Sequence, residues 1–266
     1  MKSKTIVGIV GSPNKDGRTH QLVAAALDGA TAAGAQTELI QMSEHVVDAC
    51  KDCLPWVCKD NLKCTYEDSA FDYLREKVLN AGGLVFGSPV YWSDTSAMVK
   101  FFILKMFRLY AMSGPLNGLP ALGLAIAGGT GNGLISGLRP LYHFFQIMQM
   151  RAIASVPATR FNFEFALKQA RTQGMEIGAM SEKSAPFKRR EKVLAHYDQL
   201  PYLGLDRSEE RRLLAALVAT AAAEKNDPAA LLSLAKADLL TAGNQKLAAL
   251  DEIAVAYEGG LKTIDK

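Results

Sequence analysis

The chain has 266 residues, of which 49% are hydrophobic and 21% are charged. That length allows one well-buried core with an appendage or two small domains, and the composition excludes a disordered chain. The net charge is +3 with acids and bases nearly balanced, which gives no reason to expect nucleic acid as a partner. The apolar stretch near the N-terminus is too short for a signal peptide, and no stretch is long enough to span a membrane. We therefore expect a cytoplasmic protein that does not bind membranes.

The first 180 residues alternate between strand-like and helix-like segments. Short apolar runs predict strands at 5–10, 36–41, 84–87, 121–127 and 152–156. Helical patterns lie between them at 19–34, 68–80, 95–110, 134–150 and 163–180, with Thr19 as the N-cap of the first. This alternation predicts an α/β, flavodoxin-like fold: a doubly wound five-stranded parallel sheet with helices on both faces.

The pattern changes after residue 181. A basic, proline-interrupted stretch covers 183–192, and from 208 onward only helices are predicted, at 208–225, after Asp227-Pro228, and at 245–257. We therefore divide the chain into a flavodoxin-like domain, 1–180, and a helical C-terminal extension, 181–266. Leucine stripes in the extension must be covered, either by the same subunit or at an interface: Leu213, Leu214 and Leu217, then Leu231, Leu232 and Leu239.

A Gly/Pro/Asn-rich loop, 11–19, joins the first predicted strand to the first helix. Such a loop can present backbone N–H groups and hydroxyls to an anion at a helix N-terminus. It has neither the Walker pattern nor the Gly-x-Gly-x-x-Gly dinucleotide fingerprint. The loop by itself is compatible with a phosphate site or with a plain turn.

Two more glycine-rich loops follow later strands, at 87–92 and 128–133. Ligands of open parallel sheets bind outside the carboxyl ends of the strands, so the three loops are expected to form one rim. Tyr91 and Trp92 could then lie near a flat ring, although aromatic residues more often fill a core.

The four cysteines are confined to one loop with the spacing Cys50-x2-Cys53-x4-Cys58-x5-Cys64. Four thiols in one short loop of a cytoplasmic protein indicate metal ligation and not a disulfide framework. They fit a [4Fe–4S] cluster or a four-thiolate zinc site. The crowded spacing favours the cluster. Because the loop follows the second strand, we expect it at the same sheet edge as the three loops.

These motifs resemble those of the NADPH-dependent FMN reductases over about residues 1–180, and the cysteine loop resembles their iron–sulfur flavoprotein branch. The resemblance implies that Ser12, Asn14, Arg18 and Thr19 hold the FMN phosphate. It implies that Pro89, Val90, Tyr91 and Trp92 line the isoalloxazine, and that Gly128, Gly129 and Thr130 close the third side. Relative to the family, the arginine of the first loop is displaced to Arg18, and the cysteine loop carries the insertion 54–57.

The expected function is an oxidoreductase that passes electrons between a [4Fe–4S] cluster on Cys50, Cys53, Cys58 and Cys64 and FMN. Flavin chemistry needs no catalytic side chain, because the cofactor carries the reaction, and the four histidines show no ligand spacing. The resemblance implies a ferredoxin-like or NAD(P)H donor, and a homodimer or homotetramer in which a cluster faces a neighbour's flavin. Two alternatives stay open: an NAD(P)H-dependent flavin or quinone reductase with structural cysteines, and a docking subunit of a redox complex.

Overall fold

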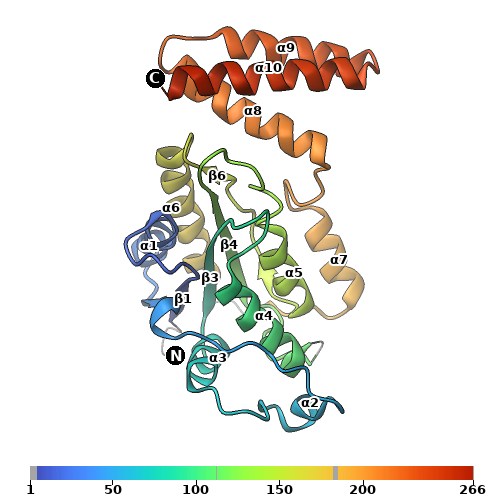
Figure 1. The fold of residues 1–266 in the computed structure, drawn as a ribbon. Coiled ribbons are helices and arrows are strands. Elements are labelled where there is room, and N and C mark those ends of the chain that lie inside the picture. The colour runs from blue at the N-terminus through green and yellow to red at the C-terminus, as the bar shows by residue number, and fades with distance from the viewer. Residues whose placement is uncertain (1–4, 112, 182–184, 266) are drawn as a thin grey trace.

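A computed structural model describes residues 5–111, 113–181 and 185–265 (Figure 1). Its strands are β1 (Ile6–Val10), β2 (Thr37–Gln41), β3 (Gly83–Pro89), β4 (Pro120–Ala127), β5 (Arg151–Ala152) and β6 (Ala158–Thr159). Its helices are α1 (Arg18–Ala32), α2 (Val57–Asn61), α3 (Ser69–Leu79), α4 (Ala97–Tyr110), α5 (Arg139–Ile147), α6 (Phe163–Met180), α7 (Arg190–Asp198), α8 (Arg207–Ala223), α9 (Ala229–Ala242) and α10 (Lys246–Ile264). A 3₁₀ turn, η1 (Met42–Glu44), follows β2.

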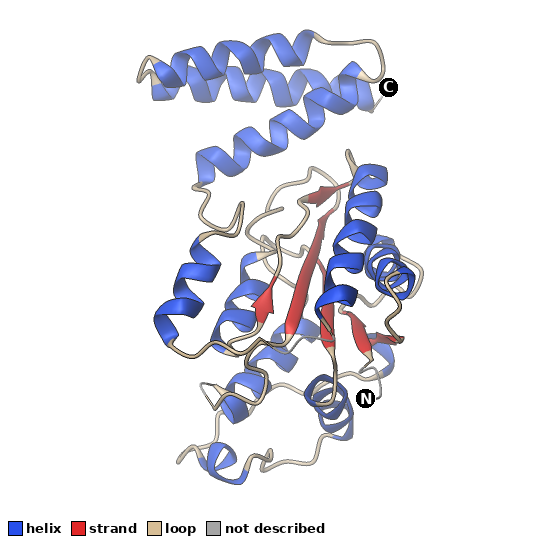
Figure 2. Cartoon of the chain, turned by 180° about the vertical axis from the view of Figure 1, so that it is seen from behind, coloured by secondary structure: helices blue, strands red, loops and turns tan. Residues whose placement is uncertain are grey.

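The strands described form one parallel sheet in the order β2-β1-β3-β4-β5, with β6 also paired to β4. This order and the helices on both faces confirm the predicted flavodoxin-like α/β class. Successive side chains of β1 divide between two cores, as the period of a strand requires. Ile6 and Val10 lie in the core beneath α1 and α6, while Val7 and Ile9 lie in the core beneath α3, α4 and α5. Figures 1 and 2 show these helices on opposite faces of the sheet.

The fifth position of the sheet differs from the single strand predicted at 152–156. It is divided into β5, which pairs with the start of β4, and β6, which pairs with its end. The segment between β5 and β6 forms hydrogen bonds through side chains, either as acceptor at its carbonyls or as donor to β4. Tyr142 donates to the Ile153 carbonyl at 2.8 Å, Ser155 to that of Gly123 at 2.6 Å, and Gln173 to that of Ala154. These side-chain bonds replace part of the backbone ladder that the prediction assumed.

Several predicted helix bounds need correction. Helix α1 begins at Arg18 with Gly17 as its N-cap, so Thr19 lies inside its first turn. The helix predicted over 134–150 is limited to Arg139–Ile147, because turns precede it. Helices α2 and α7 were not predicted from the sequence. Helix α7 packs on α5, and its Tyr197 hydroxyl donates to the Met150 carbonyl at 2.9 Å.

The C-terminal helices α8, α9 and α10 form an antiparallel bundle beyond one end of the sheet (Figure 1). The stripe predicted in α8 is covered by this chain: Leu214 is buried, and Leu213 and Leu217 pack against the core. The stripe predicted in α9 is not covered by this chain, since Leu232 and Leu239 are 73% and 75% exposed, and its burial at an interface stays a prediction. Helix α9 packs inward through a different face, on which Ala230, Leu234 and Ala237 are buried.

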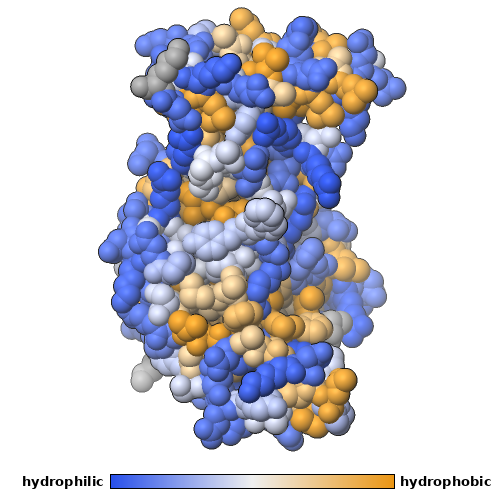
Figure 3. All heavy atoms as spheres, viewed as in Figure 1, coloured by the Kyte–Doolittle hydropathy of each residue, from blue (hydrophilic) through white to orange (hydrophobic). Residues whose placement is uncertain are grey.

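Figure 3 shows apolar surface over these C-terminal helices. Large exposed apolar side chains there include Leu232, Leu239, Leu247 and Val255. None of the described helices combines the length and apolar character that crossing a membrane requires. The division of the chain at residue 180 stays a prediction.

Candidate functional site

The first glycine-rich loop ends at the N-terminus of α1, which has no side-chain cap and no acidic residue in its first turn. Ser12 is buried, and its hydroxyl accepts the N–H of Asn14 at 3.2 Å. The Ser12 carbonyl accepts a hydrogen bond from Gln41 at 2.5 Å, which fixes the loop against β2. Arg18 is exposed, with its guanidinium 5.6 Å from the centre of the Phe163 ring, and Thr19 is buried. Uncapped N–H groups beside an arginine form a site suited to an anion.

The second loop is built around a tight turn at Tyr91–Asp94. The N–H of Tyr91 donates to the Asp94 carbonyl at 2.8 Å, and the N–H of Asp94 donates back at 3.0 Å. Trp92 and Ser93, the two central residues, have φ of 54° and 58°. Two central residues in the left-handed region correspond to the hairpin turn that glycine and asparagine usually occupy. The turn leaves Trp92 fully exposed and Tyr91 half-exposed, so neither aromatic residue is a core filler.

Hydrogen bonds join the first two loops to each other. Ser96 caps α4 by accepting the N–H of Val99, and its hydroxyl donates to the Gly11 carbonyl at 2.6 Å. The N–H of Ser96 donates to the buried Ser88 hydroxyl at 3.0 Å. The N–H of Gly11 donates to the Gly87 carbonyl at 2.8 Å. Ser88 and Ser96 were not predicted, since a single serine gives no sequence signal of this role.

The third loop lies against the second. The N–H of Val90 donates to the Ile126 carbonyl at 2.9 Å at the end of β4. Gly133 has φ of +80°, and a Cβ there would lie 2.9 Å from the Cα of Ser93. Gly128, Gly129 and Thr130 are exposed. The structure therefore places all the residues of the three predicted loops along the carboxyl edge of β1, β3 and β4. Their contacts with a cofactor stay a prediction.

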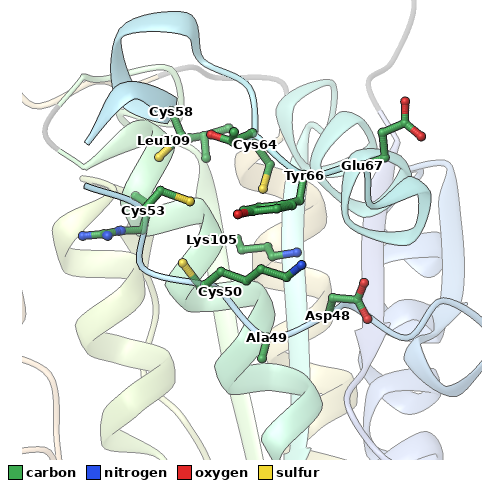
Figure 4. Close-up of a pocket in the computed structure, with 13 residues that line it drawn as sticks. Asp48, Ala49, Cys50, Cys53, Cys58, Cys64, Tyr66, Glu67, Lys105 and Leu109 are labelled. Carbon is green, nitrogen blue, oxygen red and sulfur yellow. The ribbon is translucent and has the colours of Figure 1, made fainter. Parts of the chain in front are cut away.

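All four cysteines line one cavity of about 160 Å³ (Figure 4). Cys58 is buried in α2, and Cys50, Cys53 and Cys64 are half-buried in the flanking loop. Helix α4 supplies the opposite wall through Lys105, Arg108 and Leu109. Across the described chain, which includes all four cysteines, no three His, Cys, Asp or Glu side chains lie close enough together to hold a single metal ion.

The location of the cavity corrects one expectation of the sequence analysis. The cysteine loop was expected at the same sheet edge as the glycine-rich loops, because it follows β2. Instead it returns along α4 and packs against the last turns of that helix, with the Trp56 ring 5.7 Å from the Phe107 ring. Lys105 lies roughly 14 Å along α4 from the Ser96 cap, at a rise of about 1.5 Å per residue. The 27 residues between β2 and α3 give the loop the reach for this path.

A buried ion pair supports the cysteine cavity. The ammonium of Lys105 contacts the Asp68 carboxylate, and both side chains are 4% exposed. Asp68 also accepts the N–H of Phe71 at 2.9 Å, which caps α3, and the N–H of Asp48 at 3.0 Å. Burial alone would raise the pKa of Asp68, but the hydrogen bonds from Lys105, Phe71 and Asp48 outweigh it and hold the pKa below its ordinary value. Asp68 therefore fixes the chain on both sides of the cysteines.

Other cationic groups surround the cavity. Lys51 lies 3.9 Å from the centre of the Tyr66 ring, and Arg108 lies 4.5 Å from that of Trp56 and pairs with Asp52. Lys51 lies between Cys50 and Cys53 in the sequence. Lys105 and Arg108 were missed, because only the fold brings α4 to the cysteine loop. These cations lie where they can offset the negative charge of metal-bound thiolates.

The fold and the glycine-rich edge together define a flavodoxin-like redox protein. The family model of the NADPH-dependent FMN reductases matches residues 4–168, and the chain belongs to that family. It is an oxidoreductase, and the family supports FMN as its cofactor.

Curated relatives support the iron–sulfur flavoprotein branch of the family. The iron–sulfur flavoprotein of Methanocaldococcus jannaschii is 26% identical over 189 residues, covering 65% of this chain and 94% of the relative. That of Methanosarcina thermophila is 27% identical over 145 residues, covering 54% and 74%.

Solved structures agree on the fold alone. A flavone reductase matches with a TM-score of 0.54 and 16% identity, covering 69% of this chain and 66% of that one. RosB, solved with a bound intermediate, matches with a TM-score of 0.53 and 13% identity, covering 74% and 86%.

Proposed function

We propose that this protein is an electron-transfer flavoprotein that passes electrons between a [4Fe–4S] cluster on Cys50, Cys53, Cys58 and Cys64 and FMN on the three glycine-rich loops. The observation that carries the proposal is the single cavity lined by all four cysteines in a chain of the FMN reductase family. Bound FMN would supply the conversion between one-electron and two-electron transfer. No side chain is required as acid or base for that step.

The residues of the first loop suit a terminal phosphate. The uncapped first turn of α1 offers N–H groups, and Arg18, Asn14, Ser12 and Thr19 would add a charge and polar hydrogen-bonding groups. The isoalloxazine would be lined by Pro89, Val90, Tyr91 and Trp92. The Tyr91–Asp94 turn would hold the two aromatic residues, Tyr91 and Trp92, in place. Gly128, Gly129 and Thr130 would close the third side. A loop built for one phosphate and lacking the dinucleotide fingerprint favours FMN over FAD.

The arrangement of thiols favours a cluster over zinc. Four thiolates on a tetrahedral zinc ion lie about 2.3 Å from the metal, so their sulfurs must converge on one point. The four cysteines here are crowded into 15 residues and line one common cavity. Figure 4 shows their sulfurs around that space. An iron–sulfur cluster is larger than one ion and takes its thiolates at separate corners, which agrees with this arrangement.

The separation of the two sites bears on the assembly. Within one chain, the cysteine cavity and the Ser96 end of α4 are roughly 14 Å apart along the helix. We therefore include in the proposal a cytoplasmic homodimer or homotetramer in which the cluster of one chain serves the flavin of a neighbour. The external donor would be a ferredoxin-like protein or NAD(P)H. Light scattering tests the assembly, and a monomer that retains both cofactors and full electron transfer would contradict it.

The function is tested by comparing two routes into the flavin under anaerobic conditions. The wild type and Cys50→Ala are each mixed with a reduced one-electron donor, and flavin bleaching is followed in a stopped-flow instrument. The proposal expects rapid bleaching only in the wild type. Equal bleaching of both proteins by NADPH, with no response of either to the one-electron donor, would favour the NAD(P)H-dependent flavin or quinone reductase instead.

Replacing Arg18 with alanine is expected to weaken FMN binding by about 1.5–3 kcal/mol, because a charged hydrogen bond to the phosphate is lost. The measurement is quenching of flavin fluorescence by apoprotein. Lys15→Ala is the matched control, since Lys15 is an exposed cation of the same loop that pairs with Glu44 at 2.5 Å. An unchanged dissociation constant in Arg18→Ala would remove Arg18 from the site.

Replacing Gly133 with alanine is expected to lower FMN affinity, because the new Cβ would displace the Tyr91–Asp94 turn. The matched control is Gly114→Ala. Gly114 has φ of +82° against +80° for Gly133, but nothing lies within 4 Å of its Cβ position. Both variants carry the left-handed backbone cost of about 1–2 kcal/mol, so a difference in FMN affinity isolates the clash. Equal affinities in the two variants would contradict this prediction.

A further inference from the structure

The C-terminal helices contact the third glycine-rich loop, although they lie beyond the residues matched by the family. The Tyr257 hydroxyl of α10 donates to the Thr130 carbonyl at 2.8 Å. Arg211 of α8 donates to the Asn132 side chain at 3.0 Å, and its guanidinium lies 3.9 Å from the centre of the Tyr257 ring. Leu214 fills the space beside Gly131, where a Cβ would lie 2.6 Å from its Cδ1.

A second connection joins the end of the chain to the same loop. Arg160, just after β6, donates to the Gly129 carbonyl at 2.7 Å. The same guanidinium pairs with Asp265, the residue after α10, at 2.8 and 3.0 Å. The carboxylate of Asp265 therefore orients the arginine that holds Gly129.

Glu210 of α8 fixes the far end of the loop. Glu210 is 9% exposed, and its carboxylate accepts the N–H of Ile135 at 3.0 Å and the N–H of Ser136 at 3.2 Å. It also accepts the Ser136 hydroxyl at 3.0 Å. This buried carboxylate accepts N–H groups in the turns that precede α5, much as a capping side chain does at a helix N-terminus.

These bonds determine which way the loop's peptide groups point. In a planar trans peptide, the N–H of one residue points opposite to the carbonyl of the residue before it. Because Arg160 holds the Gly129 carbonyl, the Thr130 N–H points away from Arg160. The N–H of Gly131 closes the loop on the Gly128 carbonyl at 2.8 Å. The Thr130 N–H thus points to the side of the loop opposite Arg160, and the neighbouring Gly128 and Gly129 are exposed.

We propose that the C-terminal helices position the flavin, with Glu210 and Tyr257 as positioning residues that hold the 128–136 loop in its FMN-binding conformation without touching the cofactor. The inference rests on the proposed function, because it assigns the Thr130 N–H to the flavin edge. It extends the FMN site from the family fold into a segment of the chain outside that fold.

The test is an FMN titration of full-length apoproteins. Tyr257→Phe removes one neutral hydrogen bond and is expected to raise the FMN dissociation constant about fivefold. Glu210→Ala removes bonds to a charged group and is expected to raise it tenfold or more. Glu210→Gln is expected to restore most of the affinity, because its amide oxygen can still accept the Ile135 and Ser136 N–H groups.

The matched control is Asp238→Asn, which removes the counter-charge from the Arg212–Asp238 pair between α8 and α9, at 2.5 and 2.6 Å, away from the loop. Its FMN affinity is expected to equal that of the wild type. Thermal unfolding of each apoprotein is measured in parallel, because a merely structural role would lower the midpoint and leave the dissociation constant of the folded protein unchanged.

Dissociation constants of Tyr257→Phe and Glu210→Ala within twofold of the wild type would overturn the inference, as would an equal loss in Asp238→Asn. Those outcomes leave FMN binding by the wild type intact. A wild type that binds no FMN would overturn the proposed function itself, and this inference with it.

Discussion

Replacing any one of Cys50, Cys53, Cys58 and Cys64 with alanine is expected to abolish bound iron and acid-labile sulfide while FMN stays bound. The wild type, prepared without oxygen, should contain about four iron and four sulfide per chain, as a [4Fe–4S] cluster requires. The flavin should persist in the variants because its loops lie at the Ser96 end of α4 and the cysteines at the other end. Metal and sulfide assays, with absorption and EPR spectra, measure the loss.

The matched control for the cysteine variants is Leu54→Ala. Leu54 lies between Cys53 and Cys58, is 83% exposed and does not line the cavity. This variant should keep the full iron and sulfide content. Stoichiometric zinc in wild-type protein produced with ample iron would contradict the cluster, and loss of FMN together with iron would contradict the separation of the two sites.

Asp68→Asn is expected to destabilise the protein by about 3–5 kcal/mol, because it leaves the Lys105 ammonium buried without its counter-charge. Domains of this kind have total stabilities of about 5–15 kcal/mol, so the loss is a large fraction. The same change weakens the bonds to Phe71 and Asp48 that fix the cysteine loop, so iron content should fall as well. Urea unfolding of the apoprotein measures the first effect and an iron assay the second.

Glu38→Gln is the comparison for Asp68→Asn. It removes the partner of Lys77 at 2.5 Å, in a pair whose side chains are 34% and 35% exposed. A partly solvated pair contributes about 1 kcal/mol or less, so the stability should change little. If Asp68→Asn and Glu38→Gln lower the free energy of unfolding by similar amounts, the prediction that burial makes the Asp68–Lys105 pair more important for stability is contradicted.

The sequence predicted the α/β class and the common edge of the three loops because both depend on local signals. A strand such as 121–127 is apolar throughout, and glycines mark the turns that follow such strands. The order of strands along the chain then determines which loops meet at the carboxyl edge. This is why the residues proposed for FMN, from Ser12 to Thr130, lie along one side of the sheet.

The residues that surround the cysteines could not be predicted, because they are brought together by contacts between residues far apart in the sequence. Asp68 and Lys105 are 37 positions apart and Asp52 and Arg108 are 56 apart, and neither pair leaves a pattern in the sequence. Helix α7 was missed for a different reason. Its sequence is strongly polar, and only Val193 and Tyr197 are buried, so no apolar stripe indicated a helix.

The contacts of Glu210 and Tyr257 with the third loop also could not be predicted from the neighbouring residues in the sequence. Glu210 lies among charged residues at the start of α8, where an exposed position is the ordinary expectation. The aromatic turn at Tyr91–Asp94 was hidden because Trp92 and Ser93 are not the residues that usually take left-handed conformations. Both cases concern residues whose role is determined by their neighbours in the fold.

The broken outer strand of the sheet affects how the protein can associate with other chains. An unbroken edge strand offers a row of free N–H and C=O groups on which a second chain can add a strand, and such edges promote aggregation. Here β5 and β6 pair with β4 for only two residues each, and the carbonyls of Ile153 and Ala154 between them are occupied by side chains. Among the described residues, this side of the sheet therefore offers no continuous strand as a template, which favours association through side-chain surfaces over backbone pairing.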